Sequence, residues 1–193
     1  MILSDRPRIP PADSPYGDAM GDELKRWMPP GAAVEPLNIF RTLVVNLPLA
    51  QAMRGLGSFI LGRRLSLSVR ERELIIDRAC ARCGCEYEWG VHVAAFGRSA
   101  GLSDDDIVAT AALGLAGSSL SERDLLILRL VDELHDTSAI SDELWQSLVT
   151  HWTPAQLLEM MVVVGWYHTI SYVANGVNME REGWAATFPT PRS

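Results

Sequence analysis

One short segment of the sequence gathers residue types that carry proton-transfer chemistry. Cys85, Glu88, Trp89, His92 and Phe96 recur at intervals of one, three or four residues within an apolar, helix-like pattern. On a helix they share a stripe about 100° wide, in which three ionisable groups lie beside two aromatic rings. The opposite side is small or apolar, which indicates a helix that is buried nearly all round.

Glu88 and His92 are four residues apart and would face each other in a partly dry environment. Burial raises the pKa of a carboxyl and lowers that of an imidazole, while their mutual attraction opposes both shifts. We therefore expect a group that titrates near neutral pH, as general acid–base catalysis requires. The alternative is a solvated helix pair that contributes only about 0.2–0.5 kcal/mol to helix stability.

A second carboxylate precedes this helix. Glu73 shares a helical face with Asp77 and Cys80, and a turn at Cys83 and Gly84 follows. If the two helices form an antiparallel hairpin, Glu73 and the histidine of the stripe lie at similar distances from the turn and can meet. The alternative is a surface carboxylate in the charged run that begins at residue 70.

All three cysteines, Cys80, Cys83 and Cys85, lie within six residues. At a helix start Cys85 would meet the positive end of the helix dipole, which favours a reactive thiolate; the alternative is a small packing residue. A Cys83–Cys85 disulfide is geometrically awkward. Thiolates and His92 could bind zinc, but no second ligand pair at a familiar spacing follows, so we expect neither a metal nor a cofactor.

The elements that must position these residues are predicted to be helices almost throughout. Capping signals at serine or threonine place helix starts before the apolar runs, and a glycine at 101 suits a helix end. No segment alternates with strand period. The predicted helices cover 68–82 and 85–100, and further ones begin at Ser103, Ser121 and Thr153.

Composition describes a soluble globular chain. Over 193 residues the formal charge is −7, with 48% hydrophobic and 21% charged residues. The absence of a Lys/Arg-rich run argues against nucleic acid and anionic membranes as partners. No secretory signal opens the chain and the cysteines are few, so we expect a cytoplasmic protein.

The chain divides into three predicted parts. Residues 1–35 are proline-rich and are predicted to be an extended arm, anchored by Trp27, Met28 and Val34; residues 36–182 form a helical domain, and 183–193 a tail. The apolar stretch from Leu157 to Ala174 is interrupted by polar residues. We interpret it as a helix buried in protein, against other subunits, and not as a membrane span.

With these residues in place, the sequence resembles the carboxymuconolactone decarboxylase and alkylhydroperoxidase D family. The resemblance covers about residues 36–182, with its core between 67 and 107, and rests on Glu73, Cys85, Glu88 and His92. It implies an all-α, alkylhydroperoxidase D-like helical bundle that assembles as a homo-oligomer, as trimers or hexamers of dimers.

The resemblance also implies roles for individual residues. Glu73 matches the relay carboxylate of the peroxidase branch, Cys85 its first cysteine and His92 its histidine, whereas Glu88 stands where the second cysteine is expected. Without that cysteine the internal disulfide of a peroxidase cannot form at the usual spacing. The decarboxylase branch keeps the histidine without a cysteine, and Glu86 also matches it.

We therefore predict an enzyme that performs proton-transfer or decarboxylation chemistry on a small organic acid or lactone. Glu73, Cys85, Glu88 and His92 are its candidate catalytic residues, and Trp89 and Phe96 line its substrate pocket. One alternative is a thiol-dependent alkyl hydroperoxide reductase, with peroxiredoxin-type activity, that uses Cys85 and is resolved by Cys83, Cys80 or an external thiol. Another is a non-catalytic, oligomeric protein that binds a small molecule.

Overall fold

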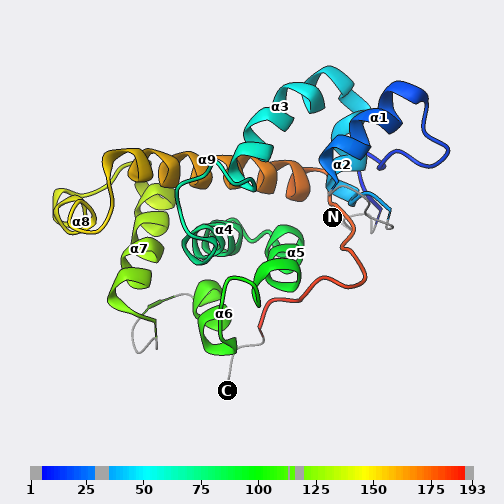
Figure 1. The fold of residues 1–193 in the computed structure, drawn as a ribbon. Coiled ribbons are helices and arrows are strands. Elements are labelled where there is room, and N and C mark those ends of the chain that lie inside the picture. Colours follow the sequence, from blue (N-terminus) through cyan, green and yellow to red (C-terminus); the bar gives the residue numbers. More distant parts are fainter. Residues whose placement is uncertain (1–5, 29–34, 113, 116–119, 190–193) are drawn as a thin grey trace. The chain divides into compact units, whose positions relative to one another are not determined.

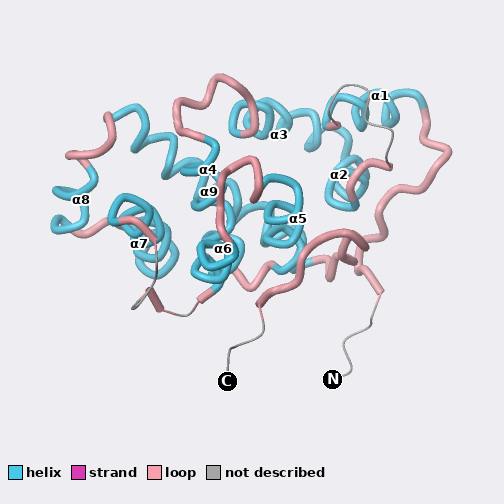
Figure 2. Tube along the Cα trace, turned by 60° about the horizontal axis from the view of Figure 1, so that its bottom comes forward, coloured by secondary structure: helices cyan, strands magenta, loops and turns pink. Residues whose placement is uncertain are grey.

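The described part of the chain is built from helices. The computed structural model describes residues 6–28, 35–112, 114–115 and 120–189. In Figures 1 and 2 these residues form helices joined by loops, with no strand among them. The predicted all-α fold class is confirmed for this part of the chain.

Contacts divide the chain into two compact units. The first comprises residues 1–65 and 174–182, and the second comprises 66–173 and 183–193. One division falls after residue 182, at the predicted position, whereas the division after residue 65 replaces the one predicted after residue 35. The difference arises because helices just after residue 35 pack with the preceding segment.

The first unit contains four short helical elements: α1 (Asp18–Trp27), α2 (Asn38–Leu43), the 3₁₀ turn η1 (Val44–Asn46) and α3 (Leu47–Ile60). Helix α1 falls where an extended arm is predicted. It forms because the chain has no proline between Pro15 and Pro29, so helical hydrogen bonds continue over this window. Leu24 is buried, and the Trp27 ring stacks on Phe40 at 4.9 Å.

The segment before α1 is fixed to the same unit by its backbone. The Arg8 amide donates to the Val177 carbonyl at 2.7 Å, and the Ala12 amide donates to the Arg41 carbonyl at 3.0 Å. The predicted anchor at Trp27 is therefore in contact with the domain, while Val34 lies outside the described residues.

The second unit carries the residues singled out from the sequence. Its helices are α4 (Val69–Arg82), α5 (Glu86–Phe96), α6 (Asp104–Ala111), α7 (Glu122–Thr137), α8 (Asp142–Leu148) and most of α9 (Pro154–Gly176). Helix α4 packs against α5, α6 and α7. Ser68 and Ser103 form capping boxes, and Ser121 caps α7, as predicted.

Ion pairs join α4 to α7 at regular positions. The pairs have a constant offset of 54 residues, so the two helices run parallel and in register. They are Arg70–Asp124, Arg78–Asp132 and Arg82–Asp136.

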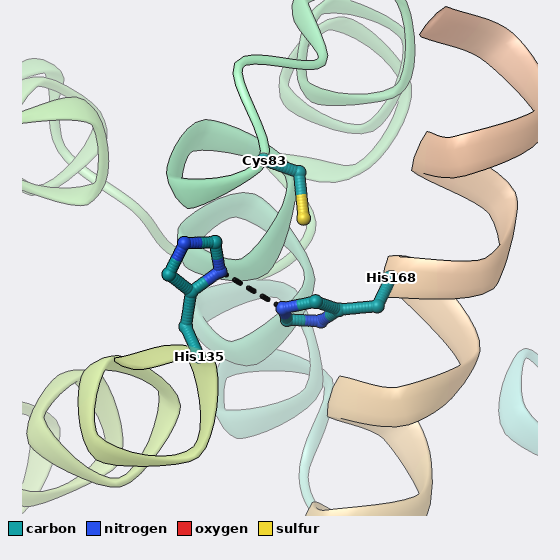
Figure 3. Close-up of side chains that lie close together, drawn as sticks. All are labelled: Cys83, His135 and His168. Atoms are coloured by element: carbon teal, nitrogen blue, oxygen red, sulfur yellow. Dashed lines mark hydrogen bonds between the residues drawn. The ribbon is translucent and has the colours of Figure 1, made fainter. Parts of the chain in front are cut away.

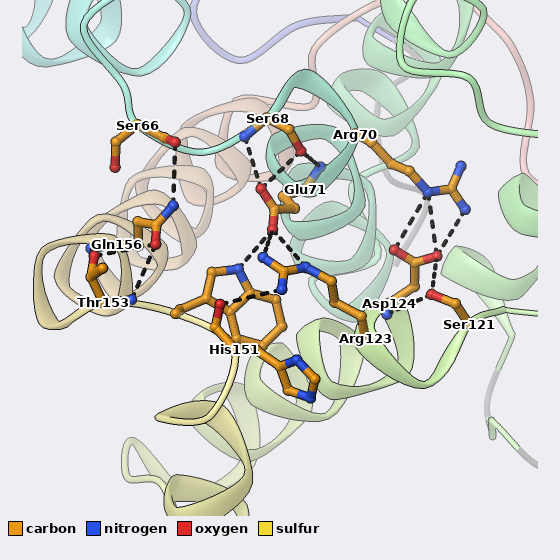
Figure 4. A network of polar contacts seen from close by, with 11 residues as sticks. Ser66, Ser68, Arg70, Glu71, Ser121, Arg123, Asp124, His151, Thr153 and Gln156 are labelled. Atoms are coloured by element: carbon orange, nitrogen blue, oxygen red, sulfur yellow. Dashed lines mark hydrogen bonds and ion pairs between the residues drawn. The ribbon is translucent and has the colours of Figure 1, made fainter.

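A buried carboxylate, Glu71, connects the start of α4 to α7 and to the turn before α9 (Figure 4). It accepts hydrogen bonds from Ser68 at 2.8 Å, from Arg123 at 2.7 Å and from the Trp152 indole at 2.7 Å. Burial alone would raise the pKa of Glu71, but these hydrogen bonds lower it below its ordinary value. Nearby, Thr153 and Gln156 exchange hydrogen bonds at the start of α9.

Two helical stretches, Asn38–Ile60 and Pro154–Gly176, are long and apolar enough to cross a membrane by length and composition. Length and composition are weak evidence for a membrane span, because core helices of soluble proteins meet the same criterion. In α9, 44% of the apolar window is buried inside the protein. The predicted burial of this helix is therefore partial.

Candidate active site

A tight hairpin brings α4 and α5 together. Gly84 lies between them with φ +60°, a backbone conformation that residues other than glycine rarely adopt. The Cys85 amide closes the turn by donating to the Cys80 carbonyl at 2.8 Å. The predicted antiparallel hairpin is thus formed, and it brings Glu73 within hydrogen-bond distance of His92.

The His92 ring is hydrogen-bonded on both sides. Its Nδ1 lies 2.8 Å from Oε2 of Glu73, and its Nε2 lies 3.0 Å from the Tyr167 hydroxyl of α9. With Glu73 as the acceptor, Nδ1 carries the proton. In the neutral ring, Nε2 then accepts from the phenol, so the three side chains form a Tyr–His–Glu chain of hydrogen bonds.

Glu73 is completely buried, and its second oxygen accepts from Nε of Arg72 at 2.7 Å. The predicted alternative of a solvated carboxylate in the charged run is therefore wrong. Arg72 is itself 7% exposed and lies over the Phe96 ring, 5.5 Å from its centroid. A guanidinium thus compensates the buried carboxylate that orients the histidine.

Glu88 also lies beside the histidine. Its Oε2 is 3.9 Å from Nε2 of His92, and both residues are buried. Burial, together with the negative charges of Glu88 and Glu73, raises the pKa of Tyr167 well above its ordinary value. The phenol therefore stays protonated and acts as a donor at neutral pH.

Cys85 is buried at the N-cap of α5. Burial raises the pKa of its thiol to about 11, although the Glu88 backbone N–H acts in the opposite direction. The helix start therefore does not produce a thiolate at neutral pH. Cys80 is fully buried nearby, and burial and the Cys85 sulfur raise the pKa of its thiol as well.

Asp77 is an additional buried acid on α4. Its side chain is fully buried, and neither carboxylate oxygen has a hydrogen-bond partner. Burial, and secondarily the charge of Glu73, raises the pKa of Asp77 well above its usual range. Asp77 is therefore held as a neutral carboxylic acid one helical turn from Glu73.

The two predicted pocket residues lie in different surroundings. The Phe96 ring is 5.3 Å from the His92 ring and is half-buried, whereas Glu73, Glu88 and Tyr167 around the same ring are buried. The Trp89 indole instead donates to Thr110 at 3.1 Å and packs against Phe188. Phe96 is thus placed to meet a ligand, whereas Trp89 contacts α6 and the C-terminal segment.

Sequence reasoning missed Tyr167 and Arg72. Tyr167 is 75 residues from His92 along the chain, so no local spacing connects them. Arg72 was visible as the neighbour of Glu73, but its position in an apparently surface-exposed charged run concealed its burial.

The fold and this site together define an all-helical protein that buries a hydrogen-bonded histidine on a helical hairpin. Residues 48–129 match the model of the Carboxymuconolactone decarboxylase family. The resemblance noted from the sequence is confirmed for this part of the chain. Among curated proteins, none matches the chain.

Solved structures share the fold. An uncharacterised peroxidase-related protein from Silicibacter sp. TM1040 has a TM-score of 0.77 at 18% identity, over 95% of this chain and 98% of its own. A protein of unknown function from Agrobacterium tumefaciens, named as a candidate antioxidant defence protein AhpD, has a TM-score of 0.62 at 22% identity, over 72% and 94%. The apo debrominase Bmp8 has a TM-score of 0.73 at 13% identity, over 93% and 95%. At these identities the similarity is one of fold.

Proposed function

We propose that this protein is an enzyme that transfers a proton at carbon in a small organic acid or lactone, with His92 as the group that exchanges the proton. The observation that carries the proposal is the buried chain Tyr167–His92–Glu73, with distances of 3.0 and 2.8 Å. An imidazole with a fixed tautomer, a carboxylate behind it and a phenol in front has the arrangement of a general acid–base group.

Decarboxylation illustrates the chemistry. The bond from the substrate carbon to its carboxylate breaks, CO₂ leaves, and the electron pair is delocalised into the conjugated lactone carbonyl. The carbon then takes a proton from Nε2 of the protonated His92, and solvent restores that proton. The Glu73 carboxylate supports this cycle because it stabilises the transient imidazolium at Nδ1.

The neighbouring side chains have complementary roles in this proposal. The Tyr167 hydroxyl is hydrogen-bonded to Nε2 in the resting protein. In this proposal the substrate carbon takes its place beside Nε2. Arg72 supplies a buried cation beside Phe96, which suits a substrate carboxylate. Glu88, whose Oε2 lies 3.9 Å from Nε2, is a second acidic group beside the ring.

The test measures turnover of a panel of carboxylated γ-lactones and β-keto acids. Two readouts are used: release of CO₂, and incorporation of deuterium into the product in D₂O. We expect Glu73→Gln and His92→Gln each to reduce turnover by about 10²–10⁴-fold, while the helical content is retained. His151→Gln is the matched control, because this histidine packs on Trp152 and makes no contact with His92. Full activity in both folded variants contradicts the mechanism.

A second candidate function is reduction of hydroperoxides by Cys85. One observation favours it: the Cys85 thiol receives the Glu88 backbone N–H, and the Cys85 sulfur raises the pKa of the Cys80 thiol. The protonated, buried state of the thiol counts against it. Robust hydroperoxide turnover that disappears in Cys85→Ser would place this function first, and Glu88→Cys should then increase it.

A non-catalytic binding role is the third possibility. It predicts saturable binding of a lactone or acid from the same panel, with no CO₂ release and no deuterium incorporation. Under this role Glu73→Gln and His92→Gln change affinity modestly and there is no turnover to lose.

A further inference from the structure

A second group of chemically active side chains lies apart from the His92 chain of hydrogen bonds. Cys83 at the end of α4, His135 in the last turn of α7 and His168 in α9 come together in space (Figure 3). One sulfur and two ring nitrogens all lie within 4.8 Å of one another. The sequence separations, 52 and 33 residues, form no recognised motif, so sequence reasoning did not find this group.

One histidine of this group already has its ring orientation fixed. Nδ1 of His168 lies 2.8 Å from the Val164 carbonyl, one turn earlier on α9. Because a carbonyl only accepts, Nδ1 carries the proton and Nε2 keeps a lone pair. This is the arrangement that metal-binding histidines commonly show, with the distal N–H donated to a backbone carbonyl.

That lone pair is directed at the second histidine. Nε2 of His168 and Nδ1 of His135 are 2.9 Å apart, so the proton between them belongs to His135 (Figure 3). The sulfur of Cys83 is directed toward the two rings. If His135 adopts its other tautomer, both ring nitrogens present lone pairs to the same point in space, which the sulfur also reaches.

The separations are close to those of a metal site. Tetrahedral zinc with one sulfur and two nitrogens holds its ligand atoms roughly 3.3–3.6 Å apart, given bond lengths of about 2.0–2.3 Å. The two ring nitrogens, 2.9 Å apart, must therefore separate by a few tenths of an ångström, and the sulfur, within 4.8 Å of both, must come to a similar distance. All three positions are half-buried, which leaves their side chains room to rotate.

The charges around the group permit a cation to bind. Arg82 lies beside it but is paired with Asp132 at 3.6 Å and with Asp136. Burial, with Arg82 and His168, lowers the pKa of His135, while the two aspartates act in the opposite direction. Burial raises the pKa of Cys83, whose proton must leave when a metal binds.

We propose that Cys83, His135 and His168 form a binding site for a thiophilic divalent cation of the Zn²⁺ type. The protein supplies three ligands and leaves a fourth position for water or another small ligand, as in zinc sites that are not purely structural. Loss of the Cys83 proton to solvent balances the step, and no oxidation or reduction takes place. The site departs from the expectation of no metal, and it differs from the Cys80/Cys83/Cys85/His92 set considered from the sequence.

The test uses the full chain, stripped of metal and without added histidines. Titration with Co²⁺ should give one bound ion per chain with a thiolate-to-metal charge-transfer band, and Zn²⁺ should displace it and release protons on binding to the apoprotein. Cys83→Ser should abolish the band. His135→Gln and His168→Gln should each weaken Zn²⁺ binding by at least about 10–100-fold. Loss of a residue that only hydrogen-bonds to a metal ligand already has an effect of this size.

His151→Gln is the matched control, because it removes the remaining histidine outside both groups and should leave Zn²⁺ affinity within about twofold. A measurement on the unmodified chain removes dependence on the folding of the variants: Zn²⁺ should protect Cys83 from alkylation, as mapped by mass spectrometry. A band that persists in Cys83→Ser, equal loss of affinity in the control, or no protection of Cys83 would overturn the proposal.

Discussion

His92 is held on both sides of its ring by groups with opposite hydrogen-bonding character. Glu73 can only accept at Nδ1, and Tyr167 stays protonated and donates at Nε2. Glu73 is in turn compensated by Arg72. At the residue scale the site is therefore a buried set of charges and dipoles whose orientation is already fixed before any substrate arrives, as electrostatic catalysis requires.

The protonation of Cys85 gives a prediction about reactivity. Its thiol has a pKa of about 11, above the ordinary 9.0, so at pH 8 its thiolate fraction is roughly 100-fold lower than that of an unperturbed thiol. The alkylation rate at Cys85, mapped by mass spectrometry, should rise about tenfold per pH unit between pH 8 and 10. A rate that reaches a plateau below pH 9 contradicts this assignment and strengthens the peroxidase alternative.

Asp77 gives a prediction about stability and pH. Because its native pKa is raised, the native state binds one proton more than the unfolded state above about pH 4. Its contribution to the free energy of unfolding therefore falls as pH rises, by about 1.4 kcal/mol per pH unit, until the native carboxyl itself ionises. Urea unfolding between pH 4.5 and 7 should show this slope in the stability difference between the wild type and Asp77→Asn.

Asp77→Asn should lack this contribution, since the amide does not titrate. The surface variant Asp104→Asn, on the exposed first turn of α6, serves as the control and should follow the wild type. If the stability difference between wild type and Asp77→Asn is independent of pH, the buried carboxyl is not held neutral.

Local spacing was sufficient for part of the site. The i,i+4 relation of Glu88 and His92, and the hairpin that joins Glu73 to His92, follow from helical periodicity and one glycine turn. Tyr167, His135 and His168 could not be found in this way, because they come from helices that only tertiary packing brings near α4 and α5.

Helix α4 is the element on which both sites depend. It packs against α5, α6 and α7 and provides Glu73, Asp77 and Cys80, while Cys83 marks its end. Its capping box and its charged pairs with α7 fix where it begins and in which register it lies. The position of Glu73 relative to His92 therefore depends on contacts several turns away.

Arg78 is the most buried of the α4 arginines that pair with α7, and its replacement gives a prediction. It is 1% exposed, pairs with Asp132 through two nitrogens at 2.7 and 2.8 Å, and donates to the Thr110 and Ala112 carbonyls. Arg78→Met should lower the free energy of unfolding by about 3–5 kcal/mol, because it leaves buried acceptors without donors.

The matched control is Arg129→Met on α7. The Arg129 side chain is 45% exposed and lies 3.7 Å from Glu143, so its loss should cost less than about 0.5 kcal/mol in the same denaturant titration. Equal destabilisation by the two variants would mean that the buried pair has no special role in holding α4 to α7.

Helix starts were predictable where a side chain caps the backbone, as at Ser68, Ser103 and Ser121. Helix α1 was not predicted, because the proline density of the whole N-terminal segment concealed a proline-free window within it. The predicted end of α5 at residue 100 is also too late. The regular helix stops at Phe96, and the following residues form turns before Gly101.

At the scale of the whole molecule, α9 carries a stripe of residues that the described part of the chain leaves exposed. The exposed positions follow at intervals of three and four residues: Leu158, Val162, Gly165, Thr169 and Tyr172. Leu158, Val162 and Tyr172 are 62%, 44% and 68% exposed. Apolar and small residues at this spacing form the seam along which two helices pack. We propose that this stripe, from 158 to 172, contributes to a homo-oligomer.

Light scattering at micromolar concentration should give a mass of at least about 42 kDa, twice the 21.2 kDa of one chain. The double variant Leu158→Glu/Val162→Glu should move the mass toward that of the monomer. It places negative charges on the stripe of each copy, so the two copies repel each other. Gln146→Glu, an exposed position on α8, is the control. A wild-type chain that is already monomeric would sink the proposal.

The proposed function depends above all on the hydrogen bonds of the His92 ring, and nitrogen NMR of the imidazole measures them without a substrate. We predict a neutral ring at alkaline pH with the proton on Nδ1, a strongly downfield Nδ1–H resonance, and an Nε2 that accepts from Tyr167. Glu73→Gln should shift or abolish that resonance, and Tyr167→Phe should change the Nε2 signal alone. A ring protonated on Nε2, or a spectrum unchanged in both variants, would contradict the proposed Tyr167–His92–Glu73 chain.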